Sequence, residues 1–587
     1  MDIEAQGPRP VETSADGAEG WEFLKAYSMG FAATVVRFLE RIDLVGWFNA
    51  RVQWDPAQCN LSPGTRLVAL ILGFLVDPQA LYKVAEFYQT FDCEVLFGAG
   101  VAPTDFTDDA LGRALIKLQA ADPRARFAEL SRAMIAEWGL PATAEVHADT
   151  STITLYGKYP GADALEPPDE AESSPDPSRL PPPAVARPTY GHNKDGHPDC
   201  KQLVVGNVAR PDGISIQVDV NDGNFDDTVW SHRTLRELTG LLQAPTKVLF
   251  VADCKAIQQK TLDLLYAEDL WFVSRLPNTF KVGGAVKLKA LAAADWTALG
   301  RLANEPKSST YAIWETTESI QGHAVRLIVV KSSTLVKKAR AKVLAHQVAQ
   351  GVRWDREAKQ LHRKFFHCEA DAQKAWTEWQ TTSAAWKWWT GTGELKSVER
   401  RHRRQGGGGL ETVTEWYWEI TRGVANSETL EQETLLEGLF VLIANAPEHS
   451  AKDALLAYKR QTAVEQDHHI LKGPLGVAPI FLKDLDKITP YVYLVYMAVL
   501  IWQVMQAVAR RTAERSGVSL PYPNGKFQPA VTTNRIKEIL SKVQVVRFRQ
   551  QQQVRRIVGT DDVTWVERVA CLLLEVKIHT LAWLPSG

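Results

Sequence analysis

Two apolar runs near the middle of the chain predict strands that lead to or from an aspartate. Residues 145–148 have an extended pattern, and the β-branched alternation of 150–156 follows directly after Asp149. Residues 247–252 are almost entirely apolar, as in a strand buried on both faces, and Asp253 follows them. The pattern therefore predicts two carboxylates at strand ends.

A third carboxylate, Glu465, lies in a run with helical spacing. Steps of three, four and seven residues put a set of side chains on roughly one face of this helix. The set comprises Tyr458, Gln461, Glu465, His468, His469 and Lys472. Two strand carboxylates and one helix carboxylate suit a pair of Mg²⁺ ions about 4 Å apart. Such a pair activates water or a 3′-hydroxyl and stabilises the leaving oxygen of a phosphodiester.

The pattern on the N-terminal side of Asp149 is helical. After a polar tail at 1–20, apolar residues recur at helical spacing and predict an all-helical domain at 21–142. Predicted strands and helices then alternate through 143–277, as in the first part of an α/β core. Within that part, 161–188 is rich in Pro, Asp, Glu and Ser, so we expect a disordered loop there.

The character of the chain changes after Asp253. Short strand-like runs are followed by a long charged helical stretch from Leu335 to about Trp389 and a strand at 413–421. Because this segment separates Asp253 from Glu465, we predict that 278–437 is a domain inserted within the catalytic fold.

A buried strand at 438–444 begins the second part of the core, 438–512, and residues 513–587 predict a small C-terminal domain. Within the second part, the 19 residues from Tyr491 to Ala509 carry no charge, which is near the length of a membrane span. They contain two glutamines, so we favour a buried core helix and expect no membrane partner.

Composition adds little to this picture. A length of 587 residues predicts about three to four domains, and a net charge of −2 hides basic clusters at 331–364, 400–404 and 547–556. The six cysteines are scattered and the N-terminus lacks the plan of a signal peptide. These features indicate neither a disulfide framework nor a zinc site, and they favour the cytoplasm.

At these motifs the chain resembles the DDE transposases of bacterial insertion sequences, which share a ribonuclease H-like core. It is similar to the group with a β-rich insertion whose glutamate lies in the signature Tyr, two residues, Arg, three residues, Glu, six residues, Lys. Tyr458, Glu465 and Lys472 match this signature, whereas Gln461 stands at the Arg position with Arg460 beside it. Runs at 62–73, 108–115, 190–203 and 478–484 extend the resemblance over roughly residues 25 to 580.

The resemblance implies an α/β fold: a ribonuclease H-like mixed-sheet core interrupted by an insertion domain, with a helical N-terminal domain and a small C-terminal domain. It implies that Asp149, Asp253 and Glu465 bind Mg²⁺, with Mn²⁺ able to substitute, and that Tyr458 and Lys472 hold phosphates near the cleaved end. The partners it implies are double-stranded DNA (terminal inverted repeats and target) and a second copy in the synaptic complex, with the protein nucleoid-associated when bound to DNA. The N-terminal helical domain is, by analogy, the candidate for binding the terminal repeats.

Other candidate DNA contacts come with structural alternatives. We expect His469 to contact DNA rather than a metal, and we include Arg460 beside the signature. Arg547 and Arg549 suit a phosphate-binding strand or, equally, a solvated edge strand. The polar loop His192 to Asp195 suggests a structural or DNA-backbone role.

The tryptophan-rich stretch from Trp376 to Trp389 suggests either base stacking or ordinary packing, with packing favoured.

The function predicted is a DNA transposase that cleaves transposon ends and joins them to target DNA. Two alternatives stay open: a catalytically silent, transposase-derived DNA-binding protein, and a nuclease without strand transfer. A carboxylate-pair glycosidase is a weaker third, because it leaves the run from Tyr458 to Lys472 unexplained. All of these depend on Asp149, Asp253 and Glu465 lining a shared pocket.

Overall fold

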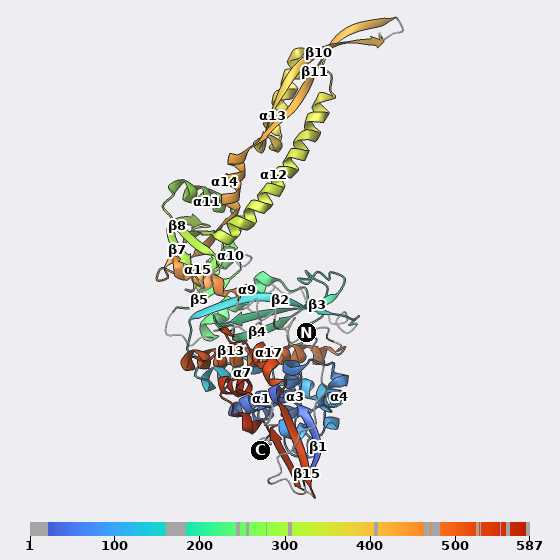
Figure 1. Ribbon diagram of the computed structural model, residues 1–587, viewed down its shortest axis with the longest axis vertical. Helices are drawn as coiled ribbons and strands as arrows, with labels where there is room; N and C mark the ends of the chain where they lie inside the picture. Colours follow the sequence, from blue (N-terminus) through green and yellow to red (C-terminus); the bar gives the residue numbers. More distant parts are fainter. Residues whose placement is uncertain are drawn as a thin grey trace, which may run out of the picture. The chain divides into compact units, whose positions relative to one another are not determined.

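The protein is mixed α/β and consists of two compact units (Figure 1). The computed structural model describes residues 21–159, 184–241, 247–253, 258–277, 279–302, 308–403, 409–462, 470, 480, 482–523, 527–528, 530–551, 553–558 and 564–582. The first unit comprises Met1–Trp271 and Lys459–Gly587, and the second comprises Phe272–Tyr458. A nine-stranded mixed sheet divides between them, with β4-β3-β2-β5 in the first unit and β6-β12-β9-β8-β7 in the second.

The four strands of the first unit are β2 (Glu145–Leu155), β3 (Lys201–Ala209), β4 (Ser215–Asn221) and β5 (Leu249–Ala252). β2 pairs antiparallel with β3 and parallel with β5, and β3 pairs antiparallel with β4. All residues of β3 and β5 are buried, as the apolar run of β5 predicts. The strands expected at Asp149 and before Asp253 are confirmed, but Asp149 lies within β2 and not at a strand end as predicted. Helices α9 (Asp227–Leu241) and α10 (Gln259–Ala267) belong to the same part of the fold.

Helices dominate the rest of the first unit. The N-terminal ones begin where the sequence supplies caps: the side chains of Ser62, Thr107 and Asp122 accept backbone N–H groups at the starts of α3, α6 and α7. These helices are α1 (Gly30–Leu39), α2 (Leu44–Asn49), α3 (Pro63–Val76), α4 (Val84–Tyr88), α5 (Cys93–Phe97), α6 (Asp108–Ala120) and α7 (Pro123–Glu137). Together they form one hydrophobic core with α17 (Leu485–Ser516).

The uncharged stretch predicted as a core helix is the centre of α17. By length and composition, α17 is the one helix, within the part of the chain the structure describes, that is able to cross a membrane without a break. Its apolar window is 89% buried inside the protein, and it packs against α3, α6, α7 and β4. This burial favours the core-helix interpretation.

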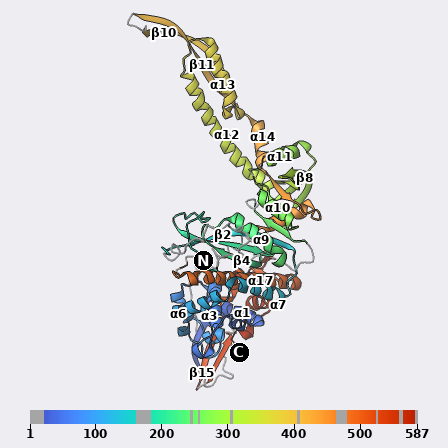
Figure 2. The same ribbon diagram turned by 180° about the vertical axis from the view of Figure 1, so that it is seen from behind.

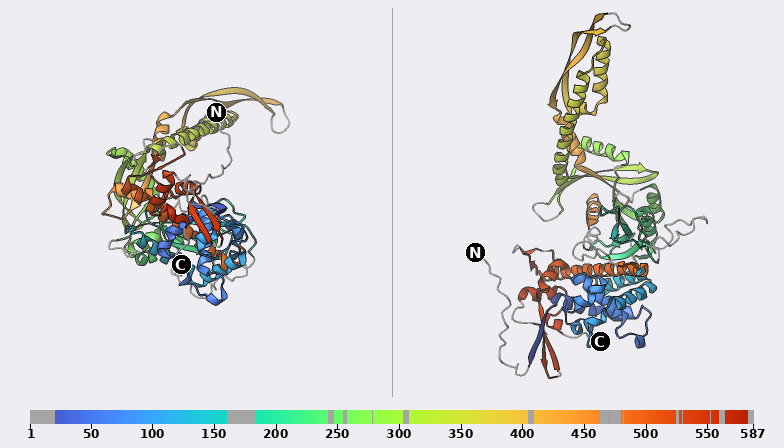
Figure 3. Two further views of the ribbon diagram at one scale, coloured as in Figure 1. Left: turned by 60° about the horizontal axis from the view of Figure 1, so that its bottom comes forward. Right: turned by 90° about the vertical axis from the view of Figure 1, so that its right-hand side faces the viewer.

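The prediction that residues 21–142 are helical throughout is wrong at its start. Glu22–Ser28 form strand β1, which pairs antiparallel with β15 (Gln544–Gln550), and β15 pairs with β16 (Gln553–Val558), as the right-hand view of Figure 3 shows. Helices α18 (Thr533–Leu540) and α19 (Trp565–Leu573) contribute to the same core as the N-terminal helices. The segment 513–587, predicted as a small C-terminal domain, therefore shares its hydrophobic core with the N-terminal helices.

In the second unit, five strands form a sheet and a separate two-stranded ribbon accompanies the longest helix. The sheet strands are β6 (Trp271–Arg275), β7 (Thr297–Arg301), β8 (Thr310–Ile320), β9 (His323–Ser332) and β12 (Leu439–Ala444). The helices are α11 (Lys281–Ala293), α12 (Ser333–His362), α13 (Glu369–Thr382), α14 (Ser427–Glu437) and α15 (Ala451–Arg460), whose last two residues belong to the first unit. Figure 2 shows α12 and α13 beside the ribbon of β10 (Trp389–Arg403) and β11 (Leu410–Ala425).

The long helical stretch predicted from Leu335 to Trp389 is broken in two. Between α12 and α13, Phe366 exchanges two backbone hydrogen bonds of 2.8 Å with Trp416 of β11, which requires an extended backbone there. Trp389, expected at the end of a helix, instead begins β10. A tertiary contact therefore overrides the local helical pattern.

The tryptophan-rich stretch is the core of this region. Trp376 and Trp418 stack with ring centroids 4.5 Å apart, and Trp379 and Trp386 pack edge-on around them. Trp376 is 8% and Trp418 is 5% exposed. Their burial supports the packing alternative over base stacking.

Candidate active site

Two of the three predicted carboxylates come together at the first unit's sheet. Strands β2 and β5 are parallel, and Ala148 lies opposite Ala252. Asp149 directly follows Ala148, and Asp253 directly follows Ala252. Neighbouring strands lie about 4.8 Å apart. Both aspartates line one pocket of about 610 Å³. The structure thus places them side by side at the wall of a cavity.

Glu465, His469 and Lys472 lie outside the described residues, so the third carboxylate and these contacts stay predictions. The residue Gln461, shortly before them in the sequence, contacts β2. Gln461 is buried, and its Nε2 donates to the Ala148 carbonyl at 3.0 Å. Its Oε1 lies 3.0 Å from His147 Nδ1. The segment that leads to Glu465 therefore starts against the residue that precedes Asp149.

Alternation along β2 shows which face is involved. Glu145, His147 and Asp149 share one face of the strand, because side chains alternate with a period of two. His147 on that face is 0% exposed and contacts Gln461. Gln461, four positions before Glu465 in the sequence, thus contacts the face of β2 that carries Asp149.

Arg460, a candidate DNA contact, forms an ion pair with Glu145. Its Nε donates to Glu145 Oε1 at 2.7 Å, its Nη2 binds the other oxygen, and His147 Nε2 lies 2.8 Å from Oε1. Burial acts to raise the pKa of Glu145, but the hydrogen bonds from His147 and Arg460 outweigh it and lower the pKa to about 2. Arg460 therefore anchors the end of α15 to β2.

Tyr458, the first residue of the signature, lies in the second unit. Its ring is half-buried and its centroid is 6.1 Å from that of Phe440 on β12. The structure shows this packing contact for Tyr458 and leaves its proposed phosphate contact as a prediction.

The start of α9 forms another wall of the pocket and was not singled out from the sequence. Asp226, Asp227, Thr228 and Trp230 all line the cavity. Asp226 Oδ1 accepts the backbone N–H of Thr228 at 2.6 Å, so it caps the helix. The sequence signal was the run of Asn, Asp and Gly at 221–227, which is typical of a helix start.

The polar loop around Lys194 contributes the pocket's lysine. Lys194 Nζ donates to the carbonyl oxygen of Thr150 at 2.7 Å and to its hydroxyl at 2.5 Å. It lies 3.4 Å from a carboxylate oxygen of Asp227. The sequence suggested a structural or DNA-backbone role for this loop, and the structure places it next to the residue that follows Asp149.

The pocket's chemistry suits a hard divalent cation. Asp149, Asp226, Asp227 and Asp253 line it together with Lys194, which leaves an excess of negative charge. Mg²⁺ prefers oxygen ligands, keeps several waters, and is often bound by one or two carboxylates together with substrate phosphates. Among the described residues, no group of three or more His, Cys, Asp or Glu side chains is arranged to hold an ion. Asp149 and Asp253 thus fit two protein ligands of such an ion.

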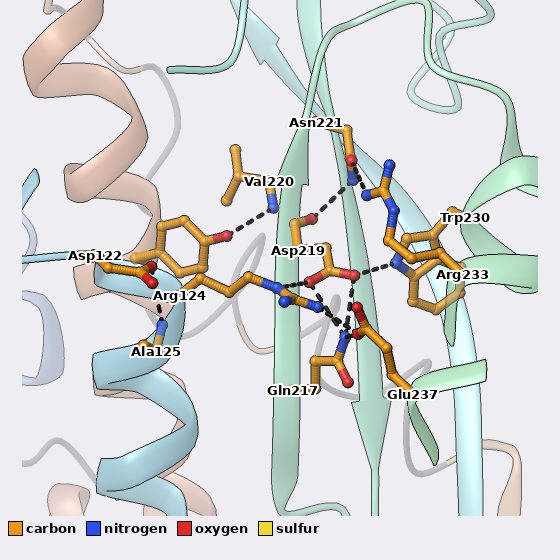
Figure 4. A network of polar contacts seen from close by, with 11 residues as sticks. Asp122, Arg124, Ala125, Gln217, Asp219, Val220, Asn221, Trp230, Arg233 and Glu237 are labelled. Carbon is orange, nitrogen blue, oxygen red and sulfur yellow. Dashed lines mark hydrogen bonds and ion pairs between the residues drawn. The ribbon is translucent and has the colours of Figure 1, made fainter. Parts of the chain in front are cut away.

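Behind the pocket, a polar network holds α9 against β4 (Figure 4). Asp219 of β4 is 0% exposed and accepts from Arg124 Nε at 2.7 Å and from Trp230 Nε1 at 2.9 Å. Arg124 also donates to Glu237 at 2.5 Å. Burial acts to lower the pKa of Arg124, but Asp219 and Glu237 outweigh it and raise the pKa above its usual value. The network links α7, β4 and α9.

Trp230 connects this network to the pocket. Its ring lies against Gly206 of β3, where a Cβ atom would come within 2.0 Å of it. Only glycine permits so close an approach of the ring to the strand. Gly206 and Asp219 together therefore fix the indole that forms one pocket wall.

The basic residues Arg547 and Arg549 lie on the central strand of the sheet β1-β15-β16, so the solvated-edge alternative is wrong for them. Arg547 is within 3.5 Å of Glu94, and Arg549 donates to Glu22 at 2.7 Å. These ion pairs tie β15 to the N-terminal segment. They leave the phosphate-binding prediction untested.

Comparison with known proteins identifies one segment. Residues 24–132 match a family model described as a domain of unknown function (DUF4277). No curated protein matches the chain. The matched segment runs from β1 into α7 and includes Arg124, and its description names no activity. The match is consistent with a transposase, but it ends before the first pocket residue, Ala148.

Proposed function

We propose that this protein is a DNA transposase that cuts the ends of its element and joins them to target DNA. The observation that carries the proposal is the β2–β5 register, which sets Asp149 and Asp253 side by side at one pocket. Two neighbouring carboxylates on a rigid sheet form a suitable platform for a divalent cation and a phosphate. The mixed sheet β4-β3-β2-β5 supports a ribonuclease H-like core as part of the proposal.

The proposed reaction has two steps. Water attacks the phosphorus at the element's end and the 3′ oxygen leaves, which yields a free 3′-hydroxyl and a 5′-phosphate. That hydroxyl then attacks a target phosphodiester, whose own 3′ oxygen leaves. Bound Mg²⁺ supplies activation of the attacking oxygen and stabilisation of the leaving one.

The protein's own groups position these reactants. Asp149 and Asp253 hold the cation, and Glu465 is proposed to complete its ligands. The contact of Gln461 with Ala148 supports this role for Glu465, because it fixes the preceding chain beside β2. Tyr458 and Lys472 as phosphate contacts, double-stranded DNA as substrate and a dimeric synaptic complex belong to the same proposal.

A cleavage assay with the full chain tests the proposal. The substrate is duplex DNA from the sequence flanking the coding region, incubated with Mg²⁺, with Mn²⁺ and with EDTA. We expect cation-dependent cutting and joined products from the wild type, and neither from Asp149→Asn or Asp253→Asn. The matched control is Asp269→Asn, since Asp269 is exposed and paired with Lys247 outside the pocket.

The other outcomes separate the alternatives. Binding without cation-dependent cutting in the wild type would identify a silent DNA-binding protein and refute the proposal. Cutting without any joined product would identify a nuclease. Full activity of both Asn variants would show that the pocket is not the active site.

A further inference from the structure

Lys194 is held at the pocket mainly by neutral oxygen atoms of Thr150. Its ammonium group has three donors, and two of its contacts are with neutral oxygens of Thr150, at 2.7 and 2.5 Å. The carboxylate of Asp227 is 3.4 Å away, longer than the 2.7–2.9 Å typical of a charge-assisted hydrogen bond. Neutral groups therefore fix the ammonium in place, and its ion pair with Asp227 is longer than a charge-assisted hydrogen bond.

Strand β2 is built to hold this loop. Thr150, Thr152 and Thr154 lie on one face of the strand, because side chains alternate. The hydroxyl of Thr152 accepts the backbone N–H of Lys194 at 3.1 Å, and that of Thr154 accepts from Asn193 Nδ2 at 3.1 Å. Three successive threonines on this face thus contact the loop. Asn193 Oδ1 in turn accepts the N–H groups of Asp195 and His197, at 2.8 and 3.2 Å.

Lys194 and Asp149 meet at the backbone of a single residue. The N–H of Thr150 donates to Asp149 Oδ1 at 2.8 Å, and the carbonyl of Thr150 accepts from Lys194 Nζ at 2.7 Å. In a strand, the N–H and C=O of one residue point to the same edge. The backbone of Thr150 therefore links Lys194 to Asp149, and both side chains line the pocket together with Asp253.

We propose that Lys194 binds a non-bridging oxygen of a DNA phosphate in this pocket. The inference rests on the proposed function and adds a residue to it. Carboxylates alone repel a phosphate, and a lysine is a compact charge well suited to attract one. Phosphate binding replaces the long contact with Asp227, while the bonds to Thr150 keep the ammonium in position.

The test combines a protein change with a substrate change. Binding of the flanking duplex is measured for the wild type and for Lys194→Met, with normal DNA and with methylphosphonates placed at the terminal phosphates one at a time. A methylphosphonate removes the negative charge of one phosphate. We expect Lys194→Met to weaken binding of normal DNA roughly ten- to a hundredfold, the range of one charge-assisted hydrogen bond.

The decisive result is at one phosphate position. There, the methylphosphonate should weaken wild-type binding but leave binding by Lys194→Met nearly unchanged, because the contact is already absent. Lys194→Arg should recover part of the affinity. The matched control is Lys158→Met, since Lys158 is exposed and lies outside the pocket lining.

A purely structural role predicts a different pattern. If Lys194→Met only displaces the loop, its effect multiplies with that of the methylphosphonate at every position, and the inference is overturned. Equal binding by Lys194→Met and the wild type also overturns it. The two proposals fail separately: without wild-type cleavage the proposed function is wrong, yet the coupling is still measurable by binding.

Discussion

The first unit's sheet carries carboxylates in two contrasting settings. Asp219 on β4 is 0% exposed and is enclosed by Arg124, Trp230 and Gln217 (Figure 4). Asp149 on β2 and Asp253 after β5, two and three strands away, line a cavity of about 610 Å³. Burying a charge is costly unless the protein supplies partners. The fold encloses Asp219 among such partners, and the pocket pair borders a cavity large enough to admit a cation as well. The contrast separates a structural carboxylate from candidate catalytic ones.

The largest expected effect is on the pocket pair. Asp149→Asn and Asp253→Asn remove a ligand charge while keeping the shape, so each should lower the cleavage rate by about 10³-fold or more. Their melting temperatures should stay within about 2 °C of the wild type. Cleavage kinetics and thermal melting measure the two quantities side by side. A variant that unfolds instead would assign that aspartate to the structural class.

The next effect is on Asp219. Asp219→Asn leaves the half-buried Arg124 beside a weakened acceptor, so we expect a loss of about 3 kcal/mol in the free energy of unfolding. Denaturant melts of the full chain measure this loss. The double variant Asp219→Asn with Arg124→Met should lose less than the sum of the single losses. An additive result would contradict the coupling that the network implies.

The ion pairs of Glu145 should make the stability of the protein depend on pH. Its pKa is about 2 in the folded protein against an ordinary value of 4.5. A depressed carboxyl pKa stabilises the folded state above the ordinary value, and this stability is lost as pH falls from about 4.5 towards 2. Between those pH values the wild type should lose about 2 kcal/mol more stability than Glu145→Gln. Parallel stability curves for the two proteins would show that Arg460 and His147 do not stabilise the carboxylate.

The smallest effect is on stability in the presence of cation. Mg²⁺ at a few times its dissociation constant should stabilise the wild type by about 1 kcal/mol, through binding to the folded state alone. Asp149→Asn should lose this increment, and Asp219→Asn should keep it. Calorimetric melts with and without Mg²⁺ measure the difference. Equal stabilisation of the wild type and Asp149→Asn would place the cation elsewhere.

Local patterns predicted the strands at Asp149 and Asp253 because each is a continuous run whose burial follows from its own residues. The same patterns missed β10, because its sequence is rich in glycine and charged residues and shows no apolar alternation, although half-buried and exposed positions alternate in its first half. They missed β1, because its partner lies far along the chain: Glu22 and Arg549 are 527 positions apart. Strand pairing at such distances leaves no local signal.

In the candidate site too, local patterns identified some residues, and others depend on tertiary contacts. The two aspartates were identified from strand patterns and resemblance, whereas Asp227, Trp230 and the role of Gly206 were not. Asp227 and Trp230 reach the pocket through the packing of α9 on the sheet, which depends on tertiary contacts such as the hydrogen bond from Trp230 to Asp219 and the close approach of its ring to Gly206. A sequence motif at a helix start predicts the cap, but it does not predict which cavity the cap faces.

The pairing of β1 with β15 has a consequence for synthesis on the ribosome. Domains generally fold as units while the chain is still growing. The second unit, Phe272–Tyr458, is continuous in sequence and can be completed during translation. The first unit cannot, because β1 must wait for Gln544–Gln550 to emerge. A nonsense mutation between β1 and β15 therefore yields a polypeptide in which β1 lacks this partner, a substrate for proteases rather than a shortened functional protein.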